Sequence, residues 1–402
     1  MEVAAALLVD EKVQWLRQQL PATAATAYFN AGTNGPLPNV VHETLRAAAT
    51  EELERGRIYP SYYRETHQVH QRLRARIAGI IGADADEVAL TRSATEGLNV
   101  ALMGLEWQRS DEVITTNLEH ICLFNVLALL AYRHGVVVRV VDVGHGAGDV
   151  AGAIAAAITP RTRAIAISHV QWSSGAIMPI AEIAATARTR GILTIVDAAQ
   201  AAGQIPVDVH ALGVDAYAVS GQKWLCGPGG TGALFVRRDR LADVRPTYIR
   251  SGSFDPSGFV VPLPGAARYE MGEHFNPAMR AQEAGLQWLV EEVGLDWLQT
   301  RIAALGARCA DGLRRIPEVT LTTPRDRMAG LVCFTLDGWH PKALADALHE
   351  RGLTIRHVEQ RPCPTVARVS IGWWNTEAEI DRLVTTVAEL AVTPPPEPMI
   401  SP

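Results

Sequence analysis

The strongest constraint on the fold is an alternation of short apolar runs with helical stretches through the first two thirds of the chain. Runs typical of buried strands lie at 112–116, 136–141, 163–168, 193–197, 215–220 and 232–237. Helical patterns occupy the stretches 123–134, up to 158, and 180–190. Buried strands separated by helices of this length predict an α/β fold with a mostly parallel sheet covered on both faces. Such sheets bind ligands at the carboxyl ends of their strands.

The rest of the chain predicts a second, smaller domain, and 402 residues are too many for one compact core. A segment rich in Pro, Gly and Ser, residues 245–264, reads as a long loop. Beyond it the expected elements are helices at 277–293, 295–315, 341–351 and 377–390, and strands at 331–336 and 367–372. We therefore expect a large domain over 22–267 and a small α+β domain over 268–402, with an N-terminal helix over 1–21 packed on the small domain. The final segment, TPPPEPMISP, cannot pack and is expected to be disordered.

Composition excludes several classes of protein. Apolar residues make up 48% and charged residues 20%, which is typical of a soluble globular chain. The net charge of −6 argues against a partner rich in phosphate, such as a nucleic acid, and no apolar run is long enough to span a membrane. Five scattered cysteines without metal-ligand spacing predict reduced thiols in the cytoplasm and no metal site.

A small polar turn, TRSATEGLN at 91–99, opens a predicted helix. Backbone amides at a helix start, together with the hydroxyls of Ser93 and Thr95, suit a phosphate group. An ordinary N-cap, with Glu96 in the first turn, also explains the motif and taken alone is the commoner case.

Two further motifs follow predicted strands. Asp197 closes the strand LTIVD, where a carboxylate faces the ligand crevice, although structural acids at strand ends are common. Lys223 lies in the glycine-rich loop SGQKWLCGPGGTG. Trp224 and Leu225 beside it argue against a solvated surface lysine, and a desolvated lysine has a lowered pKa and becomes nucleophilic.

These motifs, in this order, resemble the class V aminotransferase and cysteine desulfurase group of enzymes that use pyridoxal 5'-phosphate (PLP). The resemblance extends from YFNAGTNGPLP at 28–38 to RVSIGWWNTEAEIDRL at 368–383. It implies the PLP-dependent transferase fold type I, with a seven-stranded, mostly parallel sheet in the large domain. It also implies a homodimer with each active site at the two-fold interface, and a small amino-acid substrate.

The resemblance assigns roles to individual residues. Lys223 is implied to bind the cofactor covalently and to move the Cα proton, and Asp197 to pair with the pyridine nitrogen. Gln200 is implied to hydrogen-bond the ring hydroxyl, and His120 to stack on the ring. The implied phosphate ligands are Ser93, Ala94, Thr95, Ser220 and Gln222.

On the substrate side, the resemblance implies that Arg368 takes the carboxylate as a bidentate pair, with Arg356 assisting. Trp172 and Asn30 complete the implied substrate site. The chain departs from the family pattern at Gln222, where many relatives carry His, and at Trp172, where desulfurases commonly carry Asn. Glu273 falls where relatives offer a Thr to the neighbouring subunit's phosphate.

The interval between Arg356 and Arg368 bears on the reaction. Desulfurases carry a nucleophilic cysteine on a flexible loop well upstream of the carboxylate-binding arginine, whereas Cys363 lies five residues before Arg368 without that loop. Within the group, the chain resembles most the C–S lyase branch, and this resemblance implies cleavage of cystine or a cysteine S-conjugate to thiol, pyruvate and ammonia.

The alternatives left open are a decarboxylation-coupled oxidative deaminase, a cysteine desulfurase, an aminotransferase and an epimerase resembling isopenicillin N epimerase. A non-catalytic binding protein is disfavoured because Lys223, Asp197 and His120 are all present. The sequence leaves the sulfur substituent of the substrate open.

Overall fold

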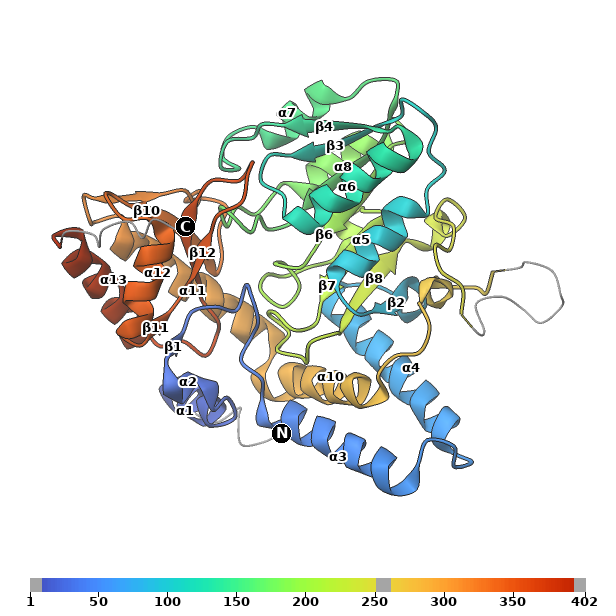
Figure 1. The fold of residues 1–402 in the computed structure, drawn as a ribbon, viewed down its shortest axis with the longest axis horizontal. Helices are drawn as coiled ribbons and strands as arrows, with labels where there is room; N and C mark the ends of the chain where they lie inside the picture. The colour runs from blue at the N-terminus through green and yellow to red at the C-terminus, as the bar shows by residue number, and fades with distance from the viewer. Residues whose placement is uncertain (1–8, 251–261, 394–402) are drawn as a thin grey trace, which may run out of the picture.

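The structure, a computed structural model, describes residues 9–250 and 262–393. Two sheets stand side by side in Figure 1, and the long helices α3 and α10 run below them. Part of the expected 245–264 loop and nearly all of the expected disordered tail lie outside the described residues.

The larger sheet has seven strands, and its order is β2-β8-β7-β6-β5-β3-β4. All pairs are parallel except those of β8, which runs antiparallel to both neighbours. The strands are β2 (Val88–Thr91), β3 (Glu112–Thr116), β4 (Val137–Val141), β5 (Thr162–Ser168), β6 (Leu193–Asp197), β7 (Ala216–Ser220) and β8 (Gly232–Val236). The predicted α/β class and mostly parallel sheet are confirmed. The residue pattern misses β2, because this strand has only four residues, three of them apolar, and so short a run is not recognised.

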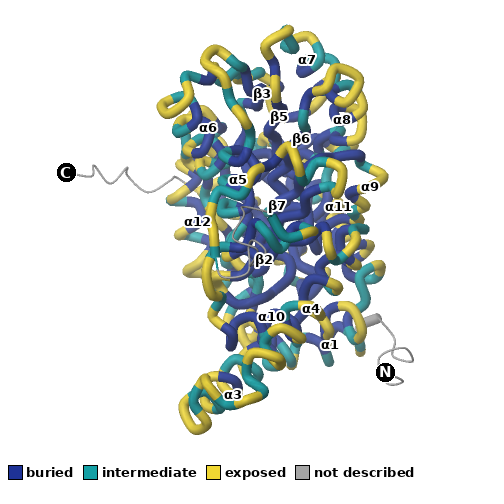
Figure 2. Tube along the Cα trace, turned by 90° about the vertical axis from the view of Figure 1, so that its right-hand side faces the viewer, coloured by how far each residue is buried: buried dark blue, intermediate teal, exposed yellow. Residues whose placement is uncertain are grey.

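Helices cover both faces of this sheet, because successive strand residues point to opposite sides. Ile195 packs with α5 and α6 on one face, whereas the next residue, Val196, packs with α4 and α8 on the other. The covering helices are α4 (Tyr62–Ile81), α5 (Ala94–Met103), α6 (Ile121–His134), α7 (Val150–Ala157), α8 (Ile180–Arg188) and α9 (Val209–Leu212). Figure 2 shows the strands β3, β5, β6 and β7 buried between them.

The smaller sheet is antiparallel, and its order is β12-β13-β10-β9. It builds a second hydrophobic core with helices α11 (Leu295–Leu313), α12 (Pro341–Glu350) and α13 (Glu377–Ala391). Its strands are β9 (Val319–Leu321), β10 (Leu331–Leu336), β12 (Arg356–Val358) and β13 (Val366–Ser370). The register of β12 and β13 sets Arg356 opposite Arg368, and this pairing prepares the site described below.

The N-terminal segment joins both parts of the molecule. β1 (Ala27–Tyr28) pairs in parallel with β11 (Leu353–Thr354), and helices α2 (Ala22–Ala25) and α3 (Asn39–Arg55) flank it. Helix α1 covers Val9–Gln18, and residues 1–8 of the expected helix lie outside the described residues. Arg17 forms an ion pair with Glu379 of α13, while Leu16 joins the core of the large sheet. The division of the chain at residues 267 and 268 stays a prediction.

The helix expected over 277–293 differs in its second half. α10 covers Asn276–Trp288, and the chain continues as one π-helical turn over Leu289–Val293 before α11 begins. A single π turn hardly changes the apolar periodicity, so the sequence pattern predicts one continuous helix.

Candidate active site

A cavity of about 220 Å³ opens at the carboxyl ends of β2, β3, β5, β6 and β7. It lies between the large sheet and the two arginines of the small sheet. The sequence-predicted residues that line it are Ser93, Ala94, Thr95, His120, Trp172, Asp197, Gln200, Ser220, Gln222, Lys223, Arg356 and Arg368. Segments far apart in the chain therefore meet at the edge where ligands of parallel sheets bind.

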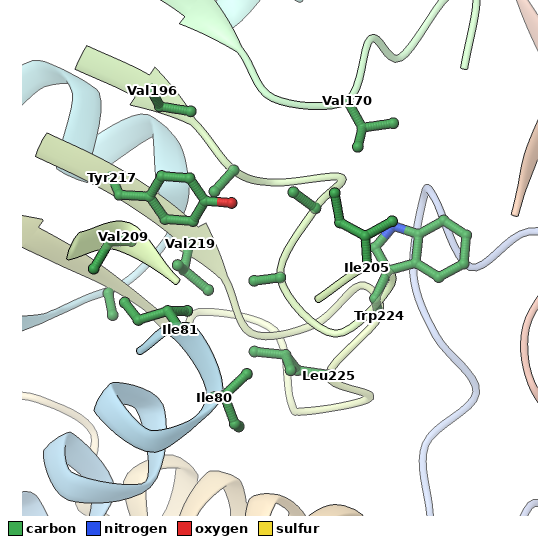
Figure 3. Packing of buried hydrophobic residues seen from close by; sticks show 14 of the residues in the cluster. Ile80, Ile81, Val170, Val196, Ile205, Val209, Tyr217, Val219, Trp224 and Leu225 are labelled. Atoms are coloured by element: carbon green, nitrogen blue, oxygen red, sulfur yellow. The ribbon is translucent and has the colours of Figure 1, made fainter. Parts of the chain in front are cut away.

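Lys223 is held in the cavity by the residues that follow it. Trp224 and Leu225 are buried in the large core, where Figure 3 shows them with Ile205. The indole nitrogen of Trp224 donates a hydrogen bond of 2.9 Å to Oε1 of Gln200. Burial lowers the pKa of Lys223 to about 8, and the negative charge of Asp197 limits that decrease. An appreciable fraction of the side chain is therefore a free amine near neutral pH, as a nucleophile or base requires.

Asp197 ends β6 with its side chain buried. Its Oδ1 accepts a hydrogen bond of 2.9 Å from the backbone N–H of Ala199. Burial raises the pKa of Asp197, whereas Lys223 and the Ala199 hydrogen bond oppose the increase. A buried carboxylate in this position favours a protonated nitrogen beside it, because a buried charge needs a partner.

His120 caps the N-terminus of α6. Its Nδ1 accepts a hydrogen bond of 3.2 Å from the backbone N–H of Cys122, so its ring proton is assigned to Nε2. Burial, followed by the positive charges of Lys223 and Arg368, lowers the pKa of His120 to about 4, so the imidazole is neutral near pH 7. The ring meets Trp172 edge to face, with 4.6 Å between the centroids.

A buried acid that the sequence analysis missed, Glu119, positions the chain just before His120. Its carboxylate accepts hydrogen bonds from the hydroxyls of Thr116 and Ser168 and from the amide of Gln171. Burial raises the pKa of Glu119 to about 7, and these hydrogen bonds limit the increase. An acid next to a predicted ring-stacking histidine was a visible signal, but only the fold reveals its three partners.

The start of α5 forms the opposite end of the cavity. Ser93 is an N-cap whose Oγ accepts a hydrogen bond of 3.1 Å from the backbone N–H of Glu96, so the ordinary N-cap expected as the alternative is present. The N–H of Ala94 reaches Ser220 Oγ at 3.4 Å, which is a weak hydrogen bond. Oε1 of Gln222 is buried without a hydrogen-bond partner among the described residues. Helix-start amides and adjacent hydroxyls at this end suit an anion.

Arg368 is the most deeply buried cation of the site, with 1% of its surface exposed. Its two terminal nitrogens donate to the carbonyl of Trp172 at 3.2 Å and to Oγ1 of Thr33 at 3.1 Å. Its Nε is buried without a partner, and no acid of the described chain lies within ion-pair distance of it. Burial lowers the pKa of Arg368 to about 10, which leaves it charged. A buried cation without a counterion requires an anionic ligand.

The structure does not bring Asn30 to the cavity. Its Oδ1 accepts a hydrogen bond of 2.7 Å from the hydroxyl of Thr33, which in turn holds Arg368. Thr33, not Asn30, lines the cavity, and so do Cys122 and Ser168. The expected direct substrate contact of Asn30 therefore gains no support, because its side chain turns toward Thr33.

Cys363 also lies away from the cavity lining. Its Sγ donates to the carbonyl of Glu119 at 3.3 Å, and the side chain packs with Trp172 and Val358. Burial raises the pKa of Cys363, so its thiol stays protonated.

Within the described part of the chain, no group of three or more His, Cys, Asp or Glu side chains could hold a metal ion. The same residues contain no helix that is both long and apolar enough to cross a membrane.

Comparison with known families decides how this cavity is interpreted. The profile described as aminotransferase class V matches residues 27–383. The chain belongs to the aminotransferase class V family. Membership confirms the resemblance found in the sequence, fold type I, PLP as the cofactor and an enzymatic activity.

The relatives of this class V chain carry several functions. A probable cysteine desulfurase 2 of Mycobacterium leprae is 30% identical, with 89% of this chain and 85% of that protein covered. The isopenicillin N epimerase of Streptomyces clavuligerus is also 30% identical, with 88% and 92% covered. Among solved structures, a complex of the cystine C–S lyase C-DES with cysteine persulfide has a TM-score of 0.87 at 29% identity, with 92% of this chain and 99% of that chain covered.

The cavity of this class V enzyme fits PLP. The start of α5 offers amides and hydroxyls for a phosphate, Asp197 offers a buried carboxylate for a pyridine nitrogen, and Lys223 offers an amine for the aldehyde. The orphaned Nε of Arg368 shows that the described residues leave a hydrogen-bond donor for an anionic ligand to satisfy. The individual residue roles stay predictions.

Proposed function

We propose that this enzyme is a PLP-dependent C–S lyase that cleaves cystine or a cysteine S-conjugate by β-elimination, releasing a thiol, pyruvate and ammonia. The observation that carries the proposal is the placement of Cys363. A desulfurase reaction at that thiol needs it to reach the substrate sulfur, whereas here it is buried against the carbonyl of Glu119. The similarity to C-DES, a cystine C–S lyase of the same fold and 29% identity, supports the same reaction class.

In this proposal each residue of the cavity has a separate role in the reaction. When bound, PLP supplies an electron sink for the bond that breaks at Cα. Lys223, with a pKa of about 8, takes the Cα proton. The buried carboxylate of Asp197 would stabilise a protonated pyridine nitrogen. Arg368 holds the substrate carboxylate and thereby sets which Cα bond faces Lys223. His120 is neutral near pH 7, so it contributes packing and hydrogen bonds but no positive charge.

Product analysis tests the proposal. The holoenzyme is given L-cystine, a panel of S-substituted L-cysteines and L-cysteine, and the products are identified by mass spectrometry. Pyruvate and ammonia are expected in equal amounts, together with cysteine persulfide from L-cystine and the free thiol from each S-substituted L-cysteine. Alanine from L-cysteine would select a desulfurase, CO₂ an oxidative decarboxylase, and a changed stereocentre an epimerase, and any of these as the main outcome overturns the lyase.

We also propose that the enzyme is a cytoplasmic homodimer. Leu53, Ile58 and Tyr63, at the corner between α3 and α4, expose 70% or more of their surface, which favours a covering partner. All five cysteines are free, in keeping with a reducing compartment. Light scattering should give twice the chain mass, and a fully active monomer at low concentration would contradict the dimer.

A further inference from the structure

The cavity contains one cysteine, Cys122, that the proposed reaction does not use. All five cysteines lie in the described residues, and Cys122 is the one that is partly exposed and lines the cavity. It follows His120 by two residues, in the first turn of α6. Its backbone N–H donates to Nδ1 of His120, which ties its position to the ring-stacking histidine.

The other four thiols are poor nucleophiles. Burial raises the pKa of Cys226, Cys309 and Cys333 to about 12, so these thiols are protonated near neutral pH. Burial also raises the pKa of Cys363, whose S–H donates to a backbone carbonyl. Because the thiolate is the reactive form, sulfur chemistry at these positions is disfavoured.

The surroundings of Cys122 attract an anionic ligand such as a persulfide. Cys122 lies in the first turn of a 14-residue helix, whose dipole favours negative charge nearby. Lys223 and Arg368 place two cations in the same cavity.

An independent observation points to a ligand in the cavity that this thiol lines. Nε of Arg368 and Nε1 of Trp172 are buried hydrogen-bond donors without partners among the described residues, and both side chains line the cavity that Cys122 lines. Both residues are more than nine-tenths buried, so these donors need acceptors from a bound molecule. A sulfur-bearing amino acid offers a carboxylate to Arg368 within the cavity that Cys122 faces.

We propose that Cys122 is a sulfur-acceptor site, which takes the outer sulfur of a persulfide released in the cavity. The inference rests on the proposed lyase function, because breaking the C–S bond of cystine leaves both sulfur atoms on the departing half as cysteine persulfide. The Cys122 sulfur attacks the outer sulfur of the persulfide. A new S–S bond forms while the S–S bond of the persulfide breaks, and its electron pair leaves on the cysteine sulfur. The proton of the Cys122 thiol ends on the released cysteine, so no oxidant or reductant is consumed.

Peptide mapping tests this acceptor. The holoenzyme is incubated with L-cystine, its thiols are blocked with iodoacetamide, and the digest is analysed without reductant, while pyruvate is measured in the same samples. The peptide that contains Cys122 should gain the mass of one sulfur atom, and the other four cysteines should not. Cys363→Ser, the matched control, should keep the added sulfur on Cys122, whereas Cys122→Ser should carry none on that peptide.

A second arm separates this inference from the lyase itself. Preformed cysteine persulfide is added to the holoenzyme, so that no C–S cleavage is needed. Sulfur on Cys122 in this arm supports the acceptor even where cystine yields no pyruvate, an outcome that counts against the lyase alone. Pyruvate without sulfur on Cys122, no transfer from preformed persulfide, or sulfur found chiefly on Cys363 overturns the proposal.

Discussion

Replacement of Arg368 by Lys is the most informative perturbation of the site. In the structure one guanidinium holds the carbonyl of Trp172 and the hydroxyl of Thr33 and keeps Nε for a ligand. A lysine preserves the charge but brings a single nitrogen without the planar fork, so it cannot keep both protein contacts and also hold a carboxylate in a fixed orientation. Arg368→Lys therefore separates geometry from charge.

The size of the effect follows from the bonds that are lost. A hydrogen bond between charged groups contributes roughly 1.5–3 kcal/mol, and about 1.4 kcal/mol corresponds to a factor of ten in rate. Loss of one such bond in the transition state predicts a decrease in kcat/KM of about one to two decades for Arg368→Lys. Arg368→Ala should lose more, because Thr33 and the Trp172 carbonyl also lose their partner.

The assay is steady-state release of pyruvate from an S-substituted cysteine, together with the visible absorbance of bound PLP. The matched control is Arg301→Lys, because Arg301 is also buried and donates to the carbonyls of Trp373 and Asn375, and none of these three residues lines the cavity. That control should lower thermal stability and leave KM unchanged. Normal kcat/KM in Arg368→Ala, or outright loss of PLP from Arg368→Lys, would refute the carboxylate role.

The remaining predictions concern charge. Loading of PLP onto the apoenzyme should accelerate as Lys223 loses its proton, with a midpoint near pH 8 rather than near 10.5, which stopped-flow absorbance measures. Borohydride should fix the cofactor on that lysine, and peptide mapping that finds the label on another residue would contradict the assignment. Asp197→Asn should move the midpoint to lower pH, because the Asp197 charge raises the pKa of Lys223; an unchanged midpoint would count against their coupling. Burial opposes ionisation of Glu270, but hydrogen bonds and the charge of Arg74 lower its pKa to about 2, so its stabilisation is present above about pH 4.5 and is lost as pH falls toward 2. Glu270→Gln should cost about 3–5 kcal/mol in chemical denaturation at pH 7, whereas Asp381→Asn, at an exposed ion pair, should leave the melting temperature nearly unchanged; equal effects would refute the burial argument.

The sequence alone predicted the features that depend on local pattern. Short apolar runs between helical stretches revealed six of the seven strands of the large sheet, since their length and their neighbours along the chain mark them as strands. The lysine loop with Trp224, the strand-end Asp197 and the N-cap turn at Ser93 are also local, because each is read from neighbouring residues. The joint order of these motifs was specific enough to predict the class V family that the comparison confirmed.

Only the tertiary structure decided which distant side chains meet. Arg368 is held by Thr33, 335 residues away in the chain, and Asn30, which was expected to contact the substrate, accepts a hydrogen bond from the hydroxyl of that threonine. Packing also turns Cys363 toward a backbone carbonyl and leaves Cys122 in the lining of the cavity. The sequence does not distinguish these two cysteines. Periodicity reports the face on which a residue lies, but burial, pKa and access depend on the segments that pack against that face. Those segments are fixed only when the whole chain has folded.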